Sequence, residues 1–302
     1  MNITYLILAH RYPEQLFRLV ERLNDEGVNF LIHIDKKVKD PEYQYVLNKL
    51  APLKNVTFIK RYTCYWGGYG IVQATFQGIR EALEGNIPFD YLCLMSGQDY
   101  PIKTNHYIRE YFKKHKGKSF INTRSFPVSL WHYHNGGYDR IQNWYFINAR
   151  NQYGFPNKLF NKLPRLSKFI SRTIGRCVPE RKWPSRYKPF GGAQFWALDK
   201  KHVSYIGDHI HQNPAYFKFF KHVLVPDEIL FQTIMGNYSH SKEEIINDTL
   251  HFLEWRRPGA VLTRVDQDNI IQTSHLFARK FDENVDPTVL DWIDREILNL
   301  NN

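Results

Sequence analysis

Cysteine is scarce in this chain, and long apolar runs are missing. Cys64, Cys93 and Cys177 are widely spaced and odd in number, so they predict neither a disulfide framework nor a zinc site. No run of about 18 apolar residues is present, which argues against a membrane-spanning helix. The segment Met1–Ala9 shows no basic leader, long apolar core or small-residue cleavage site. Together these features favour a cytoplasmic, reducing compartment.

The motifs of several common enzyme classes are also missing. No G-x-G-x-x-G pattern follows the first predicted strand, where Ala9, His10 and Arg11 stand instead. The glycines within residues 67–70 have a different spacing, so a dinucleotide oxidoreductase is disfavoured. No H-E-x-x-H, G-x-S-x-G or P-loop pattern occurs, which disfavours the common metalloprotease, hydrolase and ATPase classes.

The chain does have a large excess of positive charge, and one segment carries most of it. The formal net charge is +11, and eleven basic residues with a single acid, Glu180, lie between Arg150 and Lys188. Such a segment can bind nucleic acid, anionic lipid or an anionic substrate. No nucleic-acid-binding module is recognisable, so we do not expect nucleic acid as a partner.

Part of this basic segment has the pattern of an amphipathic helix. Residues 157–176 place apolar side chains at helical spacing with basic side chains between them. A helix of this kind could make peripheral contact with anionic lipid at the inner face of a membrane, or bind a lipid-linked acceptor. A helix packed on its own domain with a solvated basic face would give the same spacing, so both interpretations stay open.

Apolar runs of strand length alternate with segments of helical spacing along the first 120 residues. This alternation predicts an α/β fold with a mixed, mainly parallel sheet and helices on both faces. The predicted strands are Ile3–Ala9, Val28–Ile34, Val56–Ile59, Tyr91–Met95 and Phe120–Asn122, and the predicted helices are Pro13–Asn24, Pro41–Leu50, Ile71–Leu83 and Asn105–His115.

The second half of the chain is regular again after an irregular aromatic and basic stretch at residues 124–190. We expect a strand at Gly191–Leu198, a helix at Pro226–Met235, a strand at His251–Trp255 and a closing helix at Asp286–Leu298. No repeat or low-complexity tract separates these elements from the first half. The pattern therefore predicts one domain over residues 1–302, with 124–190 as an insertion.

The ends of the predicted strands mark where a ligand should bind. In an open α/β sheet, ligands lie outside the carboxyl ends of the strands. That rule directs His10, Asp35 and the turn Ser96–Asp99 towards the site, with Asp99 expected on the acceptor side. In Rossmann-like domains a carboxylate at the position of Asp35 binds a ribose or a base edge.

An acidic pair opens the predicted helix that follows Val225. Pro226 suits the first helical position, so Asp227 and Glu228 fall in the first turn, where the partial positive charge of the helix favours ionised carboxylates. An ionised Glu228 that faces a cleft could accept a proton from a sugar hydroxyl. Acids also stand at helix starts simply as capping groups, so spacing alone does not decide the role.

Two features lie near the carboxyl end. The segment from Arg256 to Lys280 mixes turn residues with basic ones that could bind a diphosphate or form a solvated surface. Asp266, Gln267 and Asp268 match the D-x-D pattern with which many glycosyltransferases hold a divalent metal. A three-residue pattern is frequent by chance, and this one lies late in the chain rather than just after a sheet strand, so a turn or helix-start role is favoured over a metal role.

Seven of these segments, in order along nearly the whole chain, resemble the family of core-2/I-branching β-1,6-N-acetylglucosaminyltransferases and peptide O-xylosyltransferases. Each segment alone is weak, but seven in sequence order are specific. The matching segments are Leu6–Arg11, Ile32–Lys37, Trp66–Gly70, Ser96–Lys103, Phe190–Trp196, Val225–Glu228 and His275–Asp282.

The resemblance implies a GT-A-type fold and an inverting transfer from a UDP-sugar, with GlcNAc or xylose as the sugar and a glycan or related acceptor. Residues 1–123 would bind the nucleotide sugar, and residues 191–302 would supply the catalytic half and the phosphate-binding tail. The resemblance implies no metal and no cofactor. Of the residues that match the family's motifs, Glu228 is the expected base, and Lys280 with Arg257 or the adjacent Arg256 would bind phosphate.

Further residues take their expected roles from the same resemblance. Asp35 matches the carboxylate that reads uracil, and Ala9, with His10 beside it, lies at the strand end that packs on the base. Trp255 and Arg140 resemble acceptor contacts. Two alternatives remain: a binding protein without catalysis on the same scaffold, or a metal-dependent transferase that uses Asp266 and Asp268.

Overall fold

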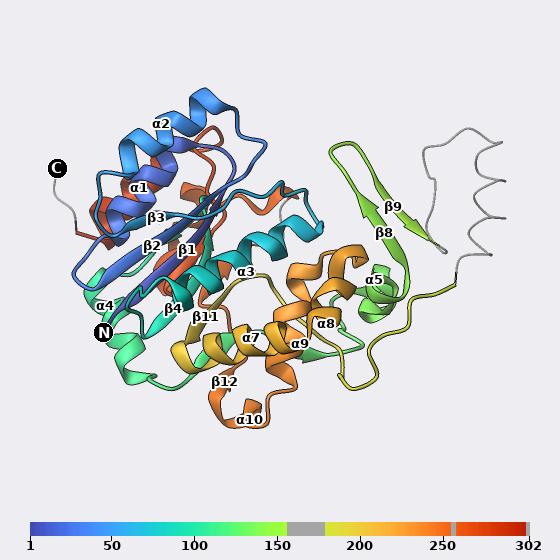
Figure 1. Ribbon diagram of the computed structural model, residues 1–302. Helices are drawn as coiled ribbons and strands as arrows, with labels where there is room; N and C mark the ends of the chain where they lie inside the picture. Colours follow the sequence, from blue (N-terminus) through green and yellow to red (C-terminus); the bar gives the residue numbers. More distant parts are fainter. Residues whose placement is uncertain (156–178, 255–257, 300–302) are drawn as a thin grey trace.

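The computed structural model describes residues 1–155, 179–254 and 258–299. Its centre is a seven-stranded sheet with the strand order β12-β6-β11-β4-β1-β2-β3 (Figure 1). β11 runs antiparallel to both β4 and β6, while the other pairs in this sheet are parallel. The strands are β1 (Ile3–Ala9), β2 (Val28–Ile34), β3 (Val56–Phe58), β4 (Tyr91–Ser96), β6 (Ser119–Ile121), β11 (Trp196–Asp199) and β12 (Ile245–Ile246).

The composition of β1 shows why it lies at the centre of this sheet. Its sequence ITYLILA is apolar almost throughout, and every residue except Leu8 is buried. A strand buried on both faces cannot alternate apolar and polar residues, which is the pattern of a parallel sheet covered by two helical layers. β1 pairs in parallel with both β2 and β4.

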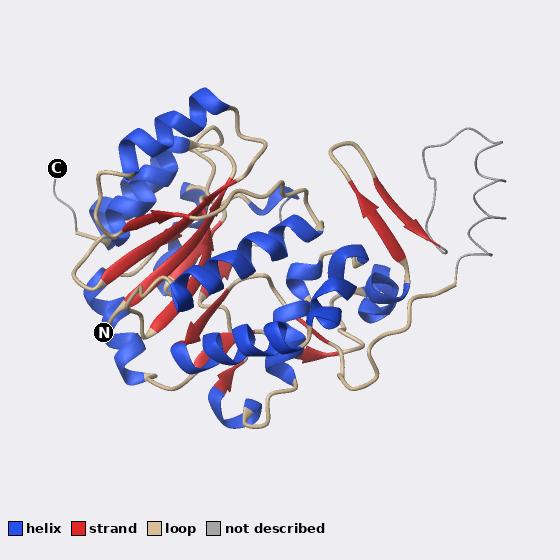
Figure 2. Ribbon diagram, viewed as in Figure 1, coloured by secondary structure: helices blue, strands red, loops and turns tan. Residues whose placement is uncertain are grey.

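Helices cover both faces of the sheet, as Figure 2 shows. One core cluster joins alternate residues of β1 to α1 (Pro13–Leu23), α2 (Asp40–Leu50), α4 (Asn105–Lys114) and α12 (Thr288–Trp292). The opposite cluster joins Leu6 and the other face of the sheet to α3 (Tyr69–Glu84), α7 (Lys200–Gln212) and α9 (Leu230–Gly236). The mixed, mainly parallel α/β fold with helices on both faces that the sequence predicts is confirmed.

A second, three-stranded sheet brings the carboxyl-terminal part of the chain to the end of β4. Its order is β13 (His251–Leu253), β14 (Phe277–Arg279) and β5 (Asp99–Pro101). The β14–β5 pair is antiparallel and sets Arg279 opposite Asp99. This sheet therefore places Lys280 beside the strand ends where the sequence predicts the ligand.

The predicted elements of the first half are found with boundaries shifted by a few residues at most, but three later ones differ. Pro226–Met235 is not one helix, because a 3-10 turn, η3 (Pro226–Glu228), ends at Ile229, whose φ of −130° is not helical, before α9 begins. Gly191–Leu198 is not one strand. Its chain leaves the sheet at Gly192, whose N–H donates to Glu228 O at 3.0 Å. The closing helix is α12 followed by a π-helical turn, η6 (Ile293–Ile297).

Other elements surround this framework. The predictions missed α7 and the hairpin of β8 (Trp144–Ile147) and β9 (Gln152–Phe155). No helix among the described residues is long and apolar enough to cross a membrane. The remaining elements are β7 (Arg124–Ser125), β10 (Phe190–Gly191), η1 (His132–Gly137), α5 (Tyr138–Gln142), α8 (Pro214–Phe219), η2 (Phe220–His222), α10 (Ser241–Glu244), η4 (Pro258–Ala260), η5 (Arg264–Asp266) and α11 (Gln267–Gln272).

Candidate active site

The carboxyl ends of β1 and β2 lie side by side and form one wall of the site. Asp35 N–H donates to Ala9 O at 2.8 Å, and a narrow cleft at this edge is lined by Ala9, His10 and Ile34, among others. The Asp35 side chain is almost fully buried, with Lys37 Nζ 3.4 Å from Oδ2. The backbone N–H of Lys37 donates to Asp35 Oδ1 at 2.9 Å. The structure thus brings Ala9, His10 and Asp35 together at the strand ends, as the sequence predicted.

Three cationic side chains, Arg11, Arg279 and Lys280, gather beside this wall. Arg11 Nη2 donates to Gln98 Oε1 at 3.0 Å, which holds the guanidinium at the end of β1. Burial lowers the pKa of Lys280 below its ordinary value, and the charges of Arg11 and Arg279 lower it further. Partial burial and the charge of Arg11 lower the pKa of His10 in the same way. Asp282 Oδ2 lies 3.7 Å from Arg11 Nη2 and offsets part of the repulsion among these groups. A bound anion would offset more of it, which is the electrostatic character of a phosphate site.

A buried network supports one member of the cluster. Asp99 is 0% exposed, and both Ser96 N–H and Ser96 Oγ donate to its carboxylate at 2.7 Å. His251 Nε2 lies 3.4 Å and Arg279 Nη1 3.2 Å from its two oxygens. Burial alone would raise the pKa of Asp99, but Arg279 and His251 outweigh it and lower the pKa. Asp99 therefore anchors Arg279, and this geometry does not fit the direct acceptor contact expected from the sequence.

The turn that carries Glu228 is fixed at three points. Val225 has a left-handed φ of 51°, and its N–H donates to Gly67 O at 2.9 Å. Gly192 N–H donates to Glu228 O at 3.0 Å. The Gln232 amide donates to Asp227 O at 3.1 Å. These bonds hold the backbone of Glu228 against the motif at residues 66–70 and the motif at residues 190–196, two of the segments that carry the family resemblance.

The side chain of Glu228 is paired with Arg140. Arg140 Nη1 donates to Glu228 Oε2 at 2.7 Å, and the Arg140 and Glu228 side chains are 10% and 28% exposed. The Arg140 guanidinium stacks on Trp131 at 3.8 Å from the ring centroid. Burial raises the pKa of Glu228, and Arg140 opposes that rise. The pair gives a partly accessible carboxylate whose pKa is raised, and a raised pKa makes a carboxylate a stronger proton acceptor.

The neighbouring Asp227 is in a more enclosed environment. Burial raises its pKa to about 7, and the charge of Glu228 adds to the rise. Asp227 Oδ1 has no hydrogen-bond partner in the part of the chain that the structure describes. Only Glu228 of the acidic pair therefore combines access with a cationic partner.

Three predicted site residues, Trp255, Arg256 and Arg257, lie outside the described residues. The chain that follows them pairs with Lys280, because Lys280 N–H donates to Ala260 O at 3.3 Å and Leu262 N–H donates to Lys280 O at 2.9 Å. The phosphate-binding roles of Arg256 and Arg257 and the acceptor role of Trp255 stay predictions.

The D-x-D segment lies at a helix start. Asp266 accepts the Thr263 N–H at 2.8 Å in a capping box, and Asp268 stands in the first turn of α11. Among the described residues, no group of three or more His, Cys, Asp or Glu side chains could hold a metal ion. This geometry fits the turn role that the sequence analysis gave as the alternative to metal binding.

Sequence reasoning missed two features of the site. Arg11 follows β1 directly, so its place at a strand end was a usable signal. The Arg140–Glu228 pair joins residues 88 positions apart, and no local pattern indicates it. Sequence similarity suggested Arg140 as an acceptor contact, whereas the structure shows it bound to the expected base.

The mainly parallel sheet and the carboxylate-and-cation site at its strand ends fit a glycosyltransferase. The family model described as Core-2/I-Branching enzyme matches residues 3–272. The chain belongs to this family of glycosyltransferases.

The chain is similar at low identity to curated xylosyltransferases. Xylosyltransferase oxt of Drosophila melanogaster is 24% identical over 85% of this chain and 27% of its own length. Human xylosyltransferase 2 is 23% identical over 97% of this chain and 33% of its own. This chain therefore spans about a quarter to a third of these relatives. A crystal structure of mouse xyloside xylosyltransferase 1 aligns over 92% of this chain and 97% of its own, with 12% identity and a TM-score of 0.39.

Proposed function

We propose that this chain is an inverting, metal-independent glycosyltransferase that moves a sugar from a UDP-sugar to an acceptor hydroxyl, with Glu228 as the base. The observation that carries the proposal is the environment of Glu228. Its carboxylate lies on a turn that hydrogen bonds hold in place, and it is partly accessible. Burial raises the pKa of Glu228, while Arg140 opposes its protonation. A general base works best with a pKa close to the working pH.

The transfer needs a single displacement. The acceptor oxygen forms a bond to C1 of the donor sugar while the bond between C1 and the diphosphate oxygen breaks, and the acceptor proton goes to Glu228. Because the attack comes from the face opposite the leaving group, the anomeric configuration inverts. One carboxylate suffices, since no covalent intermediate forms.

The leaving group gains negative charge as its bond to C1 breaks, and that charge must be met by groups already in place. Arg11 and Lys280 stand at the strand ends for this purpose, and Asp99 holds Arg279 beside them. Arg257 or Arg256 would add a further cation. The resemblance and this cluster together support a mechanism without a divalent metal.

Arg140 takes a positioning role in this scheme. Its ion pair with Glu228 keeps part of the base ionised although burial favours the neutral acid. The stacking on Trp131 holds the guanidinium plane in place. Asp35 and Ala9 would bind the uracil at the ends of β2 and β1. The xylosyltransferase relatives and the resemblance support xylose or GlcNAc as the sugar and a glycan or related molecule as the acceptor.

A panel of UDP-sugars tests the proposal. The purified chain should bind UDP and turn over one UDP-sugar in excess EDTA, and NMR of the product should show an inverted anomeric centre. Binding without turnover of any donor would favour the non-catalytic alternative. Loss of activity in EDTA that Mn²⁺ restores would favour the metal-dependent alternative with Asp266 and Asp268.

The cationic cluster has its own test. Lys280→Ala should weaken UDP binding about tenfold or more, because a charge-assisted hydrogen bond to phosphate is lost. Lys49→Ala, an exposed lysine at the end of α2, is the matched control and should bind UDP as the wild type does. Equal UDP affinity in both variants would remove Lys280 from the donor site.

The membrane contact predicted for residues 157–176 falls outside the described residues. It stays a proposal that rests on the charge pattern of the sequence. Co-sedimentation with anionic vesicles at low salt, lost at high salt, would support it, and the absence of any salt-sensitive binding would end it.

A further inference from the structure

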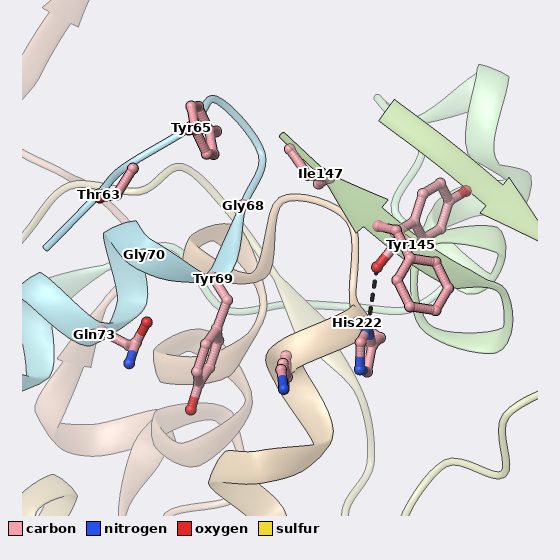
Figure 3. Close-up of a pocket in the computed structure, with 11 residues that line it drawn as sticks. Thr63, Tyr65, Gly68, Tyr69, Gly70, Gln73, Tyr145, Ile147 and His222 are labelled. Carbon is pink, nitrogen blue, oxygen red and sulfur yellow. Dashed lines mark hydrogen bonds between the residues drawn. The ribbon is translucent and has the colours of Figure 1, made fainter. Parts of the chain in front are cut away.

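A cavity of about 360 Å³ is lined by residues of α3, β8 and η2 and of the chain that leads into α3. Tyr65, Tyr69 and Gln73 contribute to one wall, and Tyr145 and His222 stand on the other (Figure 3). Its volume lies within the range of natural small-ligand sites, roughly 300–1,000 Å³, and leaves room for one or two sugar units. No step of the proposed transfer uses it.

The cavity and the catalytic turn share the same two pieces of chain. Lys221 and His222 line the cavity, and the chain then runs directly to Glu228. Gly67 O accepts the Val225 N–H at 2.9 Å, so the turn that precedes α3 is fixed to this stretch. Trp66 lies in that turn and is 73% exposed. The cavity lining and the turn that carries Glu228 are therefore joined through the bond between Gly67 and Val225.

The lining has the mixed chemistry of a carbohydrate site. The rings of Tyr65, Tyr69 and Phe146 offer flat apolar faces, while Thr63 and Gln73 offer hydrogen-bonding groups. Sugars present both kinds of surface, because their C–H faces stack on aromatic rings and their hydroxyls need partners. Gly68 and Gly70 keep the start of α3 close to the preceding turn, since a Cβ at Gly70 would lie 2.0 Å from Thr63 O.

Lys221 gives the cavity a positive charge, and none of the described residues that line it is a carboxylate. His222 Nδ1 donates to Tyr145 O at 3.2 Å, which leaves Nε2 for a ligand (Figure 3). Burial lowers the pKa of His222, and the charges of Arg181 and Lys221 lower it further. A neutral His222 would accept a hydrogen bond from a ligand hydroxyl at Nε2, and the neighbouring Lys221 would bind a ligand carboxylate.

From these observations we propose that the cavity is a remote acceptor subsite that binds a sugar carrying a carboxylate, with Lys221 on the acid group. This inference rests on the proposed transferase function, because it gives the substrate class of the same site. It predicts that the preferred acceptor is an acidic glycan whose charged unit lies away from the hydroxyl that is glycosylated.

A matched pair of small probes tests the subsite without any donor. Methyl β-D-glucuronide and methyl β-D-glucoside differ at C6, and their binding can be followed by ligand-observed NMR. We expect the wild type to prefer the glucuronide and Lys221→Ala to weaken only that probe, by about threefold to tenfold. Gln73→Ala should weaken both probes. Lys218→Ala, an exposed lysine of α8 outside the cavity lining, should bind as the wild type does.

Two results would overturn the proposal. The cavity would not recognise the carboxylate if the wild type bound both probes equally. The same would follow if the wild type and Lys221→Ala bound the glucuronide equally. Displacement of the glucuronide by an equal concentration of inorganic phosphate would mean that the cavity takes any anion. The Glu228→Gln variant should bind the probes as the wild type does. A failed subsite is therefore distinguishable from a failed transferase, which only the UDP-sugar panel tests.

Discussion

The molecule contains two arginine–carboxylate pairs that are built alike but differ in the direction in which the pKa of the carboxylate is shifted. In both, the guanidinium stacks on an aromatic ring at 3.8 Å, Arg279 on Phe195 and Arg140 on Trp131. Asp99, the partner of Arg279, has a lowered pKa, whereas Glu228, the partner of Arg140, has a raised one. The difference lies in the number of donors around each carboxylate.

Asp99 accepts hydrogen bonds from Ser96 as well as facing Arg279 and His251, so its charge is fully compensated although it is 0% exposed. Within the part of the chain that the structure describes, Glu228 accepts its side-chain hydrogen bond from Arg140, and 28% of the Glu228 side chain remains accessible. A carboxylate with many donors keeps its charge at any working pH and serves structure. Glu228 faces a single cation, and burial still raises its pKa, so this carboxylate can take up a proton and release it more readily than Asp99.

Substitution of the base should have the largest effect. Glu228→Gln keeps the size of the side chain and its contact with Arg140 but cannot accept a proton. We expect kcat to fall about a hundredfold to ten-thousandfold, with UDP affinity unchanged. The measurement is steady-state transfer beside UDP calorimetry. Turnover at the wild-type level would remove Glu228 from the mechanism and erase the difference between the two pairs.

Substitution of the other carboxylate should act on stability instead. Asp99→Asn leaves Arg279 and His251 facing an uncharged group in a fully buried place. The free energy of unfolding should fall by about 3 kcal/mol, as expected when one partner of a buried ion pair is lost. Urea unfolding of Asp99→Asn and of Glu228→Gln measures the free energy of unfolding of each variant and checks this prediction. A larger loss in Glu228→Gln than in Asp99→Asn would reverse our assignment of the structural pair.

Removal of Arg140 should shift the pH dependence. Arg140→Met keeps the stem over Trp131 but removes both effects that lower the pKa of Glu228, so that pKa rises further. Because the base acts when deprotonated, activity rises with pH through this pKa, and the acidic limb of kcat/KM should move to higher pH. Arg140→Lys keeps the charge and should restore much of the wild-type profile. An unmoved limb in Arg140→Met would mean that Arg140 does not tune the base.

The smallest effect is expected at the ring under Arg140. Trp131→Leu removes a cation–π contact worth roughly 0.5–1 kcal/mol and loosens the guanidinium plane. The acidic limb should shift in the same direction as in Arg140→Met, by less. The same pH series measures it, and a shift to lower pH would contradict the positioning role of the ring.

The sequence predicts the first half of the fold well because burial there is local and continuous. β1, β2 and β4 are nearly unbroken apolar runs, and their order follows from alternation with helices. Ala9, His10 and Asp35 were located by one rule, that ligands lie outside the carboxyl ends of strands.

The remainder depends on contacts between distant segments. The break at Ile229 accompanies the bond from Gly192 to Glu228, which no window of sequence contains. Arg140 reaches Glu228 from 88 positions away. Asp99 lies at the predicted turn, but its burial under β14 follows from a strand pairing that the pattern does not show. Asp266 illustrates the reverse, because its D-x-D pattern matched a metal motif while its side chain caps Thr263.

The central claim is that Glu228 is a carboxylate held ready to take a proton. Its titration can be observed directly as the infrared difference between the wild type and Glu228→Gln across a pH series. We predict a midpoint above the ordinary value for glutamate, about 4.3, that rises further in Arg140→Met. A midpoint at or below the ordinary value, or one that Arg140→Met leaves in place, would contradict the account.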